Sequence, residues 1–311
     1  MQGDVSTQIR AIEEGALVRA MPELGTLEVT GPERQSWLSG LVTNDLSDLK
    51  AGQGCYALHV AKNGRIQAEL WVLLEDERIL LGAQAPDMDA LFEAMDRYLI
   101  MEDAELVLPD EQPGWWLAHG PKAEQVVDAA RGVGAAAAFG HLGELPTAIV
   151  ASPTSVPNVV ETLTDVSGVV LATPDGWERI RIERMLPRYG VDFEANCYPQ
   201  EACLEHLAVS FDKGCYVGQE AVFMLEKRGH VKKRLVRLIV EGDEPVPRGT
   251  PVTTPEGEEV GHVTSSIHAD GKTWAMGLVR YKQTLSGTEL KVGQSPATVS
   301  CLAVREGGPC C

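Results

Sequence analysis

The pair Asn63-Gly64 is the strongest local constraint on the fold, because it lies between two runs of alternating apolar residues. The first run, CYALHVA, covers residues 55–61, and the second, RIQAELWVLL, covers residues 65–74. An Asn-Gly pair in this setting predicts a tight β-hairpin turn in which both residues take positive φ. The sequence therefore predicts two antiparallel strands here, which is not the pattern of a regular βαβ array.

Strand and helix patterns alternate irregularly around this hairpin. GTLEVTG (25–31) and RILLGAQ (78–84) have the composition of short strands. Residues 32–42 begin with Pro32 and group their apolar residues on one helical face, and residues 86–100 repeat this pattern. The apolar positions in the two helices are Trp37, Leu38, Leu41, Leu91, Met95 and Tyr98. This mixture indicates an α+β fold class.

The segment EGDEPVPRGTP (241–251) combines proline, glycine and acidic residues, which is typical of a linker. Beyond it the chain consists of short apolar runs separated by turns, with little helical pattern, and this favours a small antiparallel β-barrel. We therefore predict two regions, an α+β region over residues 1–240 and a C-terminal β-barrel over residues 241–311.

Composition narrows the class of protein. The 311 residues include 27 Lys and Arg against 45 Asp and Glu, a formal charge of −18, which argues against general nucleic-acid binding. The N-terminus lacks the pattern of a secretory signal, and no apolar run reaches the roughly 18 residues of a membrane span. Seven irregularly spaced cysteines suit a reducing compartment, so we expect a cytoplasmic protein without a membrane association.

The stretch FDKGCYVGQE (211–220) places one thiol, Cys215, in a constrained loop between Gly214 and Gly218. Lys213 precedes it, and residues 219–228 form the pattern of a helix. A nearby ammonium group and a helix N-terminus both favour the thiolate, which would act as a nucleophile, a redox group or a metal ligand. The alternative is a small buried side chain that fills a tight turn.

Residues 213–220, KGCYVGQE, match the motif Lys-Gly-Cys-Tyr-x-Gly-Gln-Glu without a mismatch. In this motif the chain resembles the YgfZ family of folate-binding proteins, which is related to the T-protein (aminomethyltransferase) of the glycine cleavage system. Three further stretches resemble the same superfamily, namely Thr43-Asn44-Asp45, RIRIERMLPRYGVDF (179–193) and VGHVTSSIHADGKTWAMGLVR (260–280). The resemblance implies a three-domain, ring-like T-protein-type fold that binds tetrahydrofolate, with two interleaved α+β domains within residues 1–240.

The resemblance also assigns residues to the site. It implies that Cys215 and Lys213 are catalytic, and that no residue binds a resident metal. The folate-binding residues that it implies are Glu183, Arg181, Asn44, Glu69, Tyr216, Gln219 and Glu220. A carboxylate such as Glu183 suits a pterin because it accepts paired hydrogen bonds from the amino group and the ring N–H. Without the resemblance, Glu183 is equally consistent with a solvated helix face among arginines.

One position departs from the T-protein pattern. Ala68-Glu69 stands where the T-protein has an Asp-Asp pair that includes its catalytic aspartate. Alanine performs no acid–base chemistry, and a side chain one residue further along a strand points to the opposite face. This departure disfavours an aminomethyltransferase and agrees with the thiol loop, which belongs to the YgfZ branch.

The YgfZ branch implies an accessory role in iron–sulfur cluster assembly or repair, linked to iron–sulfur enzymes that modify tRNA. The implied partners are a folate and iron–sulfur assembly proteins or client enzymes, with no direct nucleic-acid binding. The alternatives are a tetrahydrofolate-dependent aminomethyltransferase or methyltransferase, and a scaffold that has lost its ligand. Whether the chain is an enzyme stays open. A basic run over residues 227–237 is either a solvated surface or a rim that attracts the glutamate tail of a folate.

Two cysteines at the end of the chain, Cys310 and Cys311, follow a Glu-Gly-Gly-Pro segment. Two ligands alone rarely hold a metal, and no third ligand is near in sequence, so we do not predict a metal site there.

Overall fold

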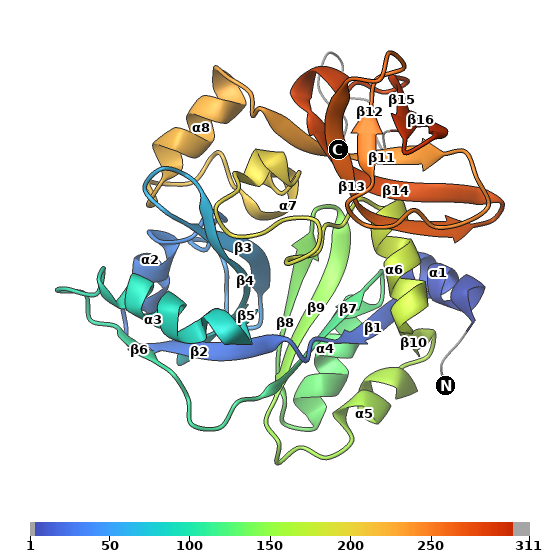
Figure 1. The fold of residues 1–311 in the computed structure, drawn as a ribbon. Helices are drawn as coiled ribbons and strands as arrows, with labels where there is room; N and C mark the ends of the chain where they lie inside the picture. Colours follow the sequence, from blue (N-terminus) through green and yellow to red (C-terminus); the bar gives the residue numbers. More distant parts are fainter. Residues whose placement is uncertain (1–3, 301–311) are drawn as a thin grey trace. The chain divides into compact units, whose positions relative to one another are not determined.

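The computed structural model describes residues 4–300, in which the chain divides into two compact units (Figure 1). The first unit contains residues up to 176 together with 206–219, and the second contains 177–205 together with the residues from 220 onward. Each unit is described separately below. No helix within residues 4–300 is long and apolar enough to cross a membrane.

The first unit contains two five-stranded sheets. One has the strand order β10-β1-β7-β9-β8, in which only β10 and β1 are parallel, and the other has the antiparallel order β3-β4-β5-β2-β6. The first sheet is built from β1 (Ala16–Ala20), β7 (Gly114–His119), β8 (Ala136–Leu142), β9 (Leu145–Ser152) and β10 (Val169–Leu171). The second is built from β2 (Leu24–Thr30), β3 (Gly54–Val60), β4 (Ile66–Leu74), β5 (Arg78–Gln84) and β6 (Glu105–Val107). The chain therefore enters the first sheet, completes the second, and returns to the first.

Helices complete the cores of these sheets. Helices α2 (Arg34–Ser39) and α3 (Met88–Asp96) pack on the second sheet, where Trp37, Leu38, Leu91 and Met95 are buried as their spacing predicts. Helices α4 (Ala123–Gly132) and α5 (Val159–Asp165) contribute to the core of the first sheet, and α1 (Val5–Glu14) precedes β1. Helix α7 (Glu205–Ala208) leads into the thiol-containing segment, and α8 (Gln219–Lys227) follows it.

The predicted hairpin is present, but its turn differs from the prediction. Strands β3 and β4 pair in the antiparallel register Leu58↔Glu69, and the turn between them has three residues, 62–64. Of the Asn-Gly pair, only Gly64 has a positive φ, 77°, and its N–H donates to the Ala61 carbonyl over 2.7 Å. The turn is therefore a type I turn followed by a left-handed glycine, which needs one positive φ where a two-residue turn needs two.

The second unit contains a closed antiparallel barrel with the strand order β11-β14-β13-β12-β15-β16. Its strands are β11 (Lys233–Val240), β12 (Pro251–Thr253), β13 (Glu259–Ala269), β14 (Lys272–Arg280), β15 (Glu289–Val292) and β16 (Ser295–Ser300). Valine, leucine and alanine side chains from all six strands fill its interior. The C-terminal part of α6 (Pro174–Glu183) packs on the barrel through a second, smaller core that includes Ile182, Leu235 and Met276.

The α+β class and the C-terminal barrel are as the sequence predicts, with one difference at the boundary. Strand β11 ends at Val240 and belongs to the barrel, although position 241 is where the sequence places the beginning of that domain. Residues 241–250 connect β11 to β12, so the segment with linker composition is a loop within the barrel. Proline and acidic residues are as typical of exposed loops between strands as of linkers, so composition does not separate the two.

Candidate functional site

The thiol loop, residues 209–218, lies between α7 and α8 and is anchored on the segment 39–44 that follows α2. The Val217 N–H donates to the Gly40 carbonyl over 3.0 Å, and the Ser210 N–H donates to the Thr43 carbonyl over 3.0 Å. The buried Thr43 hydroxyl donates to the Ala208 carbonyl over 2.6 Å. Hydrogen bonds at both ends of the loop therefore hold it on this segment.

Lys213 provides the central anchor of the loop. Its side chain is buried, and its ammonium group donates to the carbonyl oxygens of Ser39, Val42 and Asn44 over 2.7, 2.8 and 2.7 Å. Burial lowers the pKa of Lys213 to about 8, against the opposing effect of the Asp45 carboxylate. All three N–H donors of the ammonium group are thus in use, so Lys213 positions the loop in this structure, and its catalytic role stays a prediction.

Cys215 lies two residues beyond this anchor and is exposed to solvent. The structure therefore excludes the alternative in which this thiol is a buried side chain filling a turn. The two glycines around it differ. Gly218 has a φ of 81°, and a Cβ atom there would lie 2.3 Å from the Ala61 carbonyl oxygen, whereas a Cβ on Gly214 would meet no atom within 4 Å. Only Gly218 is thus required by the geometry of the loop.

Tyr216 points into the protein, in contrast to Cys215. Its side chain is 7 % exposed, and its ring lies 5.2 Å from the Lys213 Nζ. Burial raises the pKa of the Tyr216 hydroxyl. That hydroxyl has no hydrogen-bond partner within residues 4–300, which is rare for a buried polar group and identifies it as a candidate contact for a ligand.

The remaining predicted residues of the first unit have different surroundings. The side-chain amide of Asn44 donates to the Tyr56 carbonyl over 2.9 Å, and its carbonyl oxygen accepts from the Asp45 N–H, so it shapes its own segment. Gln219 donates to the Gly214 carbonyl over 3.3 Å and closes the thiol loop from the first residue of α8. Glu220 is exposed.

Glu69 is buried inside the first unit. Its two carboxylate oxygens accept hydrogen bonds from the Tyr56 hydroxyl and the Gln84 amide, both over 2.9 Å. Burial raises the pKa of Glu69 above its usual value, against these two hydrogen bonds. Ala68 belongs to the core formed with α2 and α3, as do the alternate residues Leu70 and Val72 of β4. The two positions therefore face opposite sides of β4, and the contacts of Glu69 are internal to the protein rather than available to a folate.

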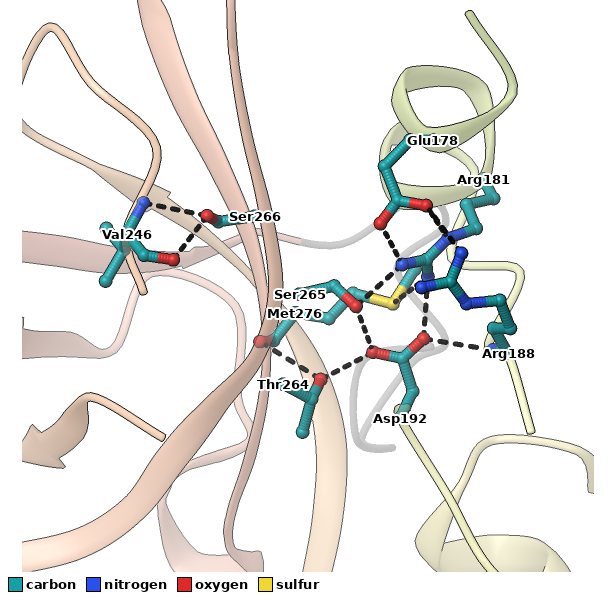
Figure 2. Close-up of polar contacts among 9 residues, drawn as sticks. All are labelled: Glu178, Arg181, Arg188, Asp192, Val246, Thr264, Ser265, Ser266 and Met276. Atoms are coloured by element: carbon teal, nitrogen blue, oxygen red, sulfur yellow. Dashed lines mark hydrogen bonds and ion pairs between the residues drawn. The ribbon is translucent and has the colours of Figure 1, made fainter. Parts of the chain in front are cut away.

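Arg181 also has an internal role, in the second unit (Figure 2). It is 1 % exposed, and its guanidinium group contacts Asp192 over 2.6 Å, Ser265 over 2.7 Å, and both carboxylate oxygens of Glu178. Asp192 in turn accepts hydrogen bonds from the hydroxyl groups of Thr264 and Ser265, each over 2.6 Å. This cluster joins α6 to β13, so the prediction that Arg181 binds the folate does not agree with its burial.

Glu183, two residues further along α6, is the accessible carboxylate of this stretch. Its side chain is 26 % exposed, and Oε1 forms an ion pair with Arg179 over 2.9 Å. The Glu183 main-chain carbonyl accepts from Arg237, whose guanidinium carbon lies 4.9 Å from the Trp274 ring centre. Oε2 makes no hydrogen bond in the part of the chain that the structure describes, so it can accept one from a ligand.

Sequence reasoning did not single out Asp192 or Ser265 as partners of Arg181, since no local pattern identifies a hydrogen bond between distant segments.

The other described cysteines differ from Cys215. Cys55 is buried, which raises the pKa of its thiol to about 12, and Cys203 is buried with its Sγ 3.2 Å from the Leu235 carbonyl oxygen. Residues 4–300 contain no group of three His, Cys, Asp or Glu side chains suited to a metal. Cys310 and Cys311 lie outside the described residues.

Comparisons with known proteins agree with this architecture. The GCVT N-terminal domain family matches residues 1–145, and the CAF17 C-terminal beta-barrel domain family matches residues 232–303. Over these two segments the chain is similar to proteins of the glycine cleavage T-protein superfamily. The second match begins one residue before β11, which supports the inclusion of that strand in the barrel.

Individual relatives support the same placement. An aminomethyltransferase of Herpetosiphon aurantiacus is 26% identical over 308 residues, which cover 91% of this chain and 84% of the relative. An aminomethyltransferase of Thermotoga neapolitana is 25% identical over 297 residues, covering 88% and 80%. The crystal structure of the glycine cleavage system aminomethyltransferase T from Bartonella henselae matches with a TM-score of 0.77 and 21% identity, covering 98% of this chain and 91% of that one. This similarity confirms the T-protein-type fold.

Proposed function

We propose that the chain is a cytoplasmic, folate-binding accessory protein that acts in iron–sulfur cluster assembly or repair through the thiol of Cys215. The observation that carries this proposal is the position of Cys215, which is exposed on a loop that Lys213 holds through three hydrogen bonds. A structural cysteine is normally buried, as Cys55 and Cys203 are. A fixed, exposed thiol suits a group that meets another molecule.

Each unit offers one polar group that suits a folate. In the second unit, Oε2 of Glu183 is free to accept a hydrogen bond from an N–H group of the pterin. In the first unit, the buried hydroxyl of Tyr216 lacks a partner within residues 4–300 and is a separate candidate contact for a ligand. When bound, tetrahydrofolate supplies the ability to carry a one-carbon unit. The similarity of residues 1–145 to the GCVT N-terminal domain family also supports a folate as the ligand.

The thiol supplies the chemistry that the iron–sulfur proposal needs. Cysteine thiolates are the usual protein ligands of iron–sulfur clusters, and one exposed thiol can hold a cluster only together with ligands from another molecule. Residues 4–300 offer no three-ligand group of their own, so a cluster would be cargo shared with a partner. The motif KGCYVGQE is the basis for the link to iron–sulfur proteins, and to the enzymes among them that modify tRNA.

A tetrahydrofolate-dependent aminomethyltransferase is the second candidate, because the relatives reported above carry that name. The structure does not favour it. Ala68 has no acid–base group, and both carboxylate oxygens of Glu69 accept hydrogen bonds inside the protein. For Glu69 to replace the missing aspartate, it would have to leave Tyr56 and Gln84.

Binding of tetrahydrofolate, measured by calorimetry, tests the first part of the proposal. Glu183→Gln should weaken binding by about tenfold, since it removes the charge of one hydrogen-bond acceptor. Glu289→Gln, which changes an exposed carboxylate of the same unit, is the matched control and should bind like the wild type. Equal binding by both variants would remove Glu183 from the site, and no binding by the wild type would contradict the folate proposal.

An assay of aminomethyl transfer separates the two candidates. The wild-type protein is incubated with tetrahydrofolate and an aminomethylated lipoyl carrier protein, and methylene-tetrahydrofolate is measured. The proposed accessory role predicts no product above the background without protein. Product that disappears in Glu69→Gln would establish the transferase instead.

A further inference from the structure

Four exposed basic side chains lie between the last residue of α8 and the first residue of β11, both included. They are Lys227, Arg228, Lys232 and Lys233. None of them forms an ion pair or a side-chain hydrogen bond within residues 4–300. Two further bases of the same run differ, because Arg234 is buried in an ion pair with Glu205, and Arg237 is buried against Trp274. Four exposed bases without an ion pair thus lie within residues 227–233 of a chain whose net charge is −18.

Helix α8 also carries an exposed apolar side chain. Met224 is 55 % exposed and precedes Lys227 by three residues, so these two side chains lie on one face of α8. Arg228 directly follows the last residue of the helix. We call Met224 and the four bases the α8 surface. Methionine is flexible and polarisable, and it is frequent where one surface accepts different partners.

The segment after α8 is held in place by the barrel. The His230 ring stacks on the Tyr281 ring with centroids 4.2 Å apart and planes 7° apart, and the Tyr281 N–H donates to the Lys232 carbonyl over 3.0 Å. The positions of Lys232 and Lys233 are therefore fixed by the fold, which lowers the entropic loss when a partner binds.

We infer that the α8 surface docks an acidic segment of a partner protein, with one apolar side chain of that segment on Met224. Carboxylates complement the four unpaired bases, and the apolar contact gives the surface a preference that charge alone does not give. A nucleic acid fits less well, because its phosphates require a wider basic face and the rest of the chain is acidic. Helix α8 begins at Gln219, four residues after Cys215, so the docking surface directly follows the thiol loop in the sequence.

Binding of two labelled octapeptides, followed by fluorescence anisotropy, tests this inference on the full chain. The first probe is Glu-Glu-Leu-Glu-Glu-Leu-Glu-Glu, and the second has serine in place of both leucines. The wild type should prefer the leucine probe. Replacing the four bases of the α8 surface by serine should weaken binding of both probes by about tenfold or more.

The matched control variant replaces four exposed bases elsewhere by serine, which gives the same net charge. These are Arg10, Lys50, Lys62 and Arg97. This control should bind like the wild type, and circular dichroism shows whether each variant is folded. Met224→Ser should weaken binding of the leucine probe by severalfold and leave the serine probe unchanged, a difference that general loss of structure would not produce.

Three results would overturn the inference. The first is equal binding by the α8-surface variant and its matched control, which would make the four bases an ordinary solvated surface. The second is tighter binding of a uridine oligonucleotide with the charge of the probes, which would indicate a nucleic-acid surface. The third is displacement of the leucine probe by a triglutamyl folate but not by a monoglutamyl folate, which would assign the surface to a folate tail. The folate-binding proposal would survive the first two results and be strengthened by the third.

Discussion

Two buried cations, Lys213 in the first unit and Arg181 in the second, are bound in different ways. In the first unit, the ammonium group of Lys213 is surrounded by three neutral main-chain carbonyls. In the second, the guanidinium group of Arg181 is paired with the carboxylates of Asp192 and Glu178. Lys213 anchors the loop that carries the exposed thiol of Cys215, whereas Arg181 joins α6 to the barrel.

The comparison shows that one sequence motif can contain both residues that stabilise the structure and residues that are available to a ligand. In KGCYVGQE, Lys213 fixes the loop and Cys215 faces the solvent. In the stretch around Arg181, the arginine is internal and Glu183 keeps one free carboxylate oxygen. Neighbouring residues of one motif therefore have separate roles, and burial distinguishes them.

The largest effect is expected when Arg181 is removed. Arg181→Met leaves the side chain of Asp192, which is 0 % exposed, without its counter-charge, and this should lower the free energy of unfolding by about 3–5 kcal/mol. Arg188→Met, which removes a half-exposed partner of Glu178, should change it by about 1 kcal/mol or less. Denaturant unfolding measures both. Similar losses in the two variants would show that Arg181 is not the centre of the cluster.

Removing Lys213 should have a smaller effect on stability and a larger one on the thiol loop. Lys213→Met leaves three carbonyls without their donor, which should lower the free energy of unfolding by about 2–3 kcal/mol. Hydrogen exchange should increase in residues 209–218, and the exposed Lys50→Met should leave both quantities unchanged. Unchanged exchange in the loop would contradict the positioning role of Lys213.

The two glycines of the thiol loop sharpen this comparison. Gly218→Ala places a Cβ against the Ala61 carbonyl at a positive φ, and should lower the free energy of unfolding by about 2 kcal/mol. Gly214→Ala adds a methyl group in open space and should stay within about 0.5 kcal/mol of the wild type. Thermal unfolding checks both. Equal changes in stability for the two variants would mean that the thiol loop does not pack against Ala61, in the turn between β3 and β4.

The smallest effect concerns pH and Glu69. Because burial raises the folded-state pKa of Glu69 above its unfolded value, its contribution to stability is complete below the unfolded pKa of about 4.5. This contribution is lost as the pH rises through the raised folded-state value. Glu69→Gln does not titrate, so the wild type should lose stability relative to this variant as the pH increases from about 4.5. A constant difference across this range would show that Glu69 titrates normally.

The sequence predicts elements whose signals are local. The strand 78–84 and the helix before Asp96 follow from apolar spacing, and the position of Cys215 just before a helix follows from the pattern of residues 219–228. The acceptors of the Lys213 ammonium group cannot be predicted from local sequence, because the segment 39–44 is about 170 residues away in the chain. The same holds for Ser265, which lies 84 residues from Arg181. Such contacts depend on tertiary structure. Sequence patterns therefore identify the candidate residues, but they do not show which of them are buried anchors and which are accessible to a ligand.

Alkylation of the native protein by iodoacetamide, followed at each cysteine by peptide mass spectrometry, tests the central claim most directly. Cys215 should react first, Cys55 and Cys203 should react only after unfolding, and saturating tetrahydrofolate should slow the reaction at Cys215. That result would establish an accessible thiol that a bound folate shields. A Cys215 that reacts as slowly as the buried cysteines, or at a rate unaffected by the folate, would contradict the proposed role of the thiol loop.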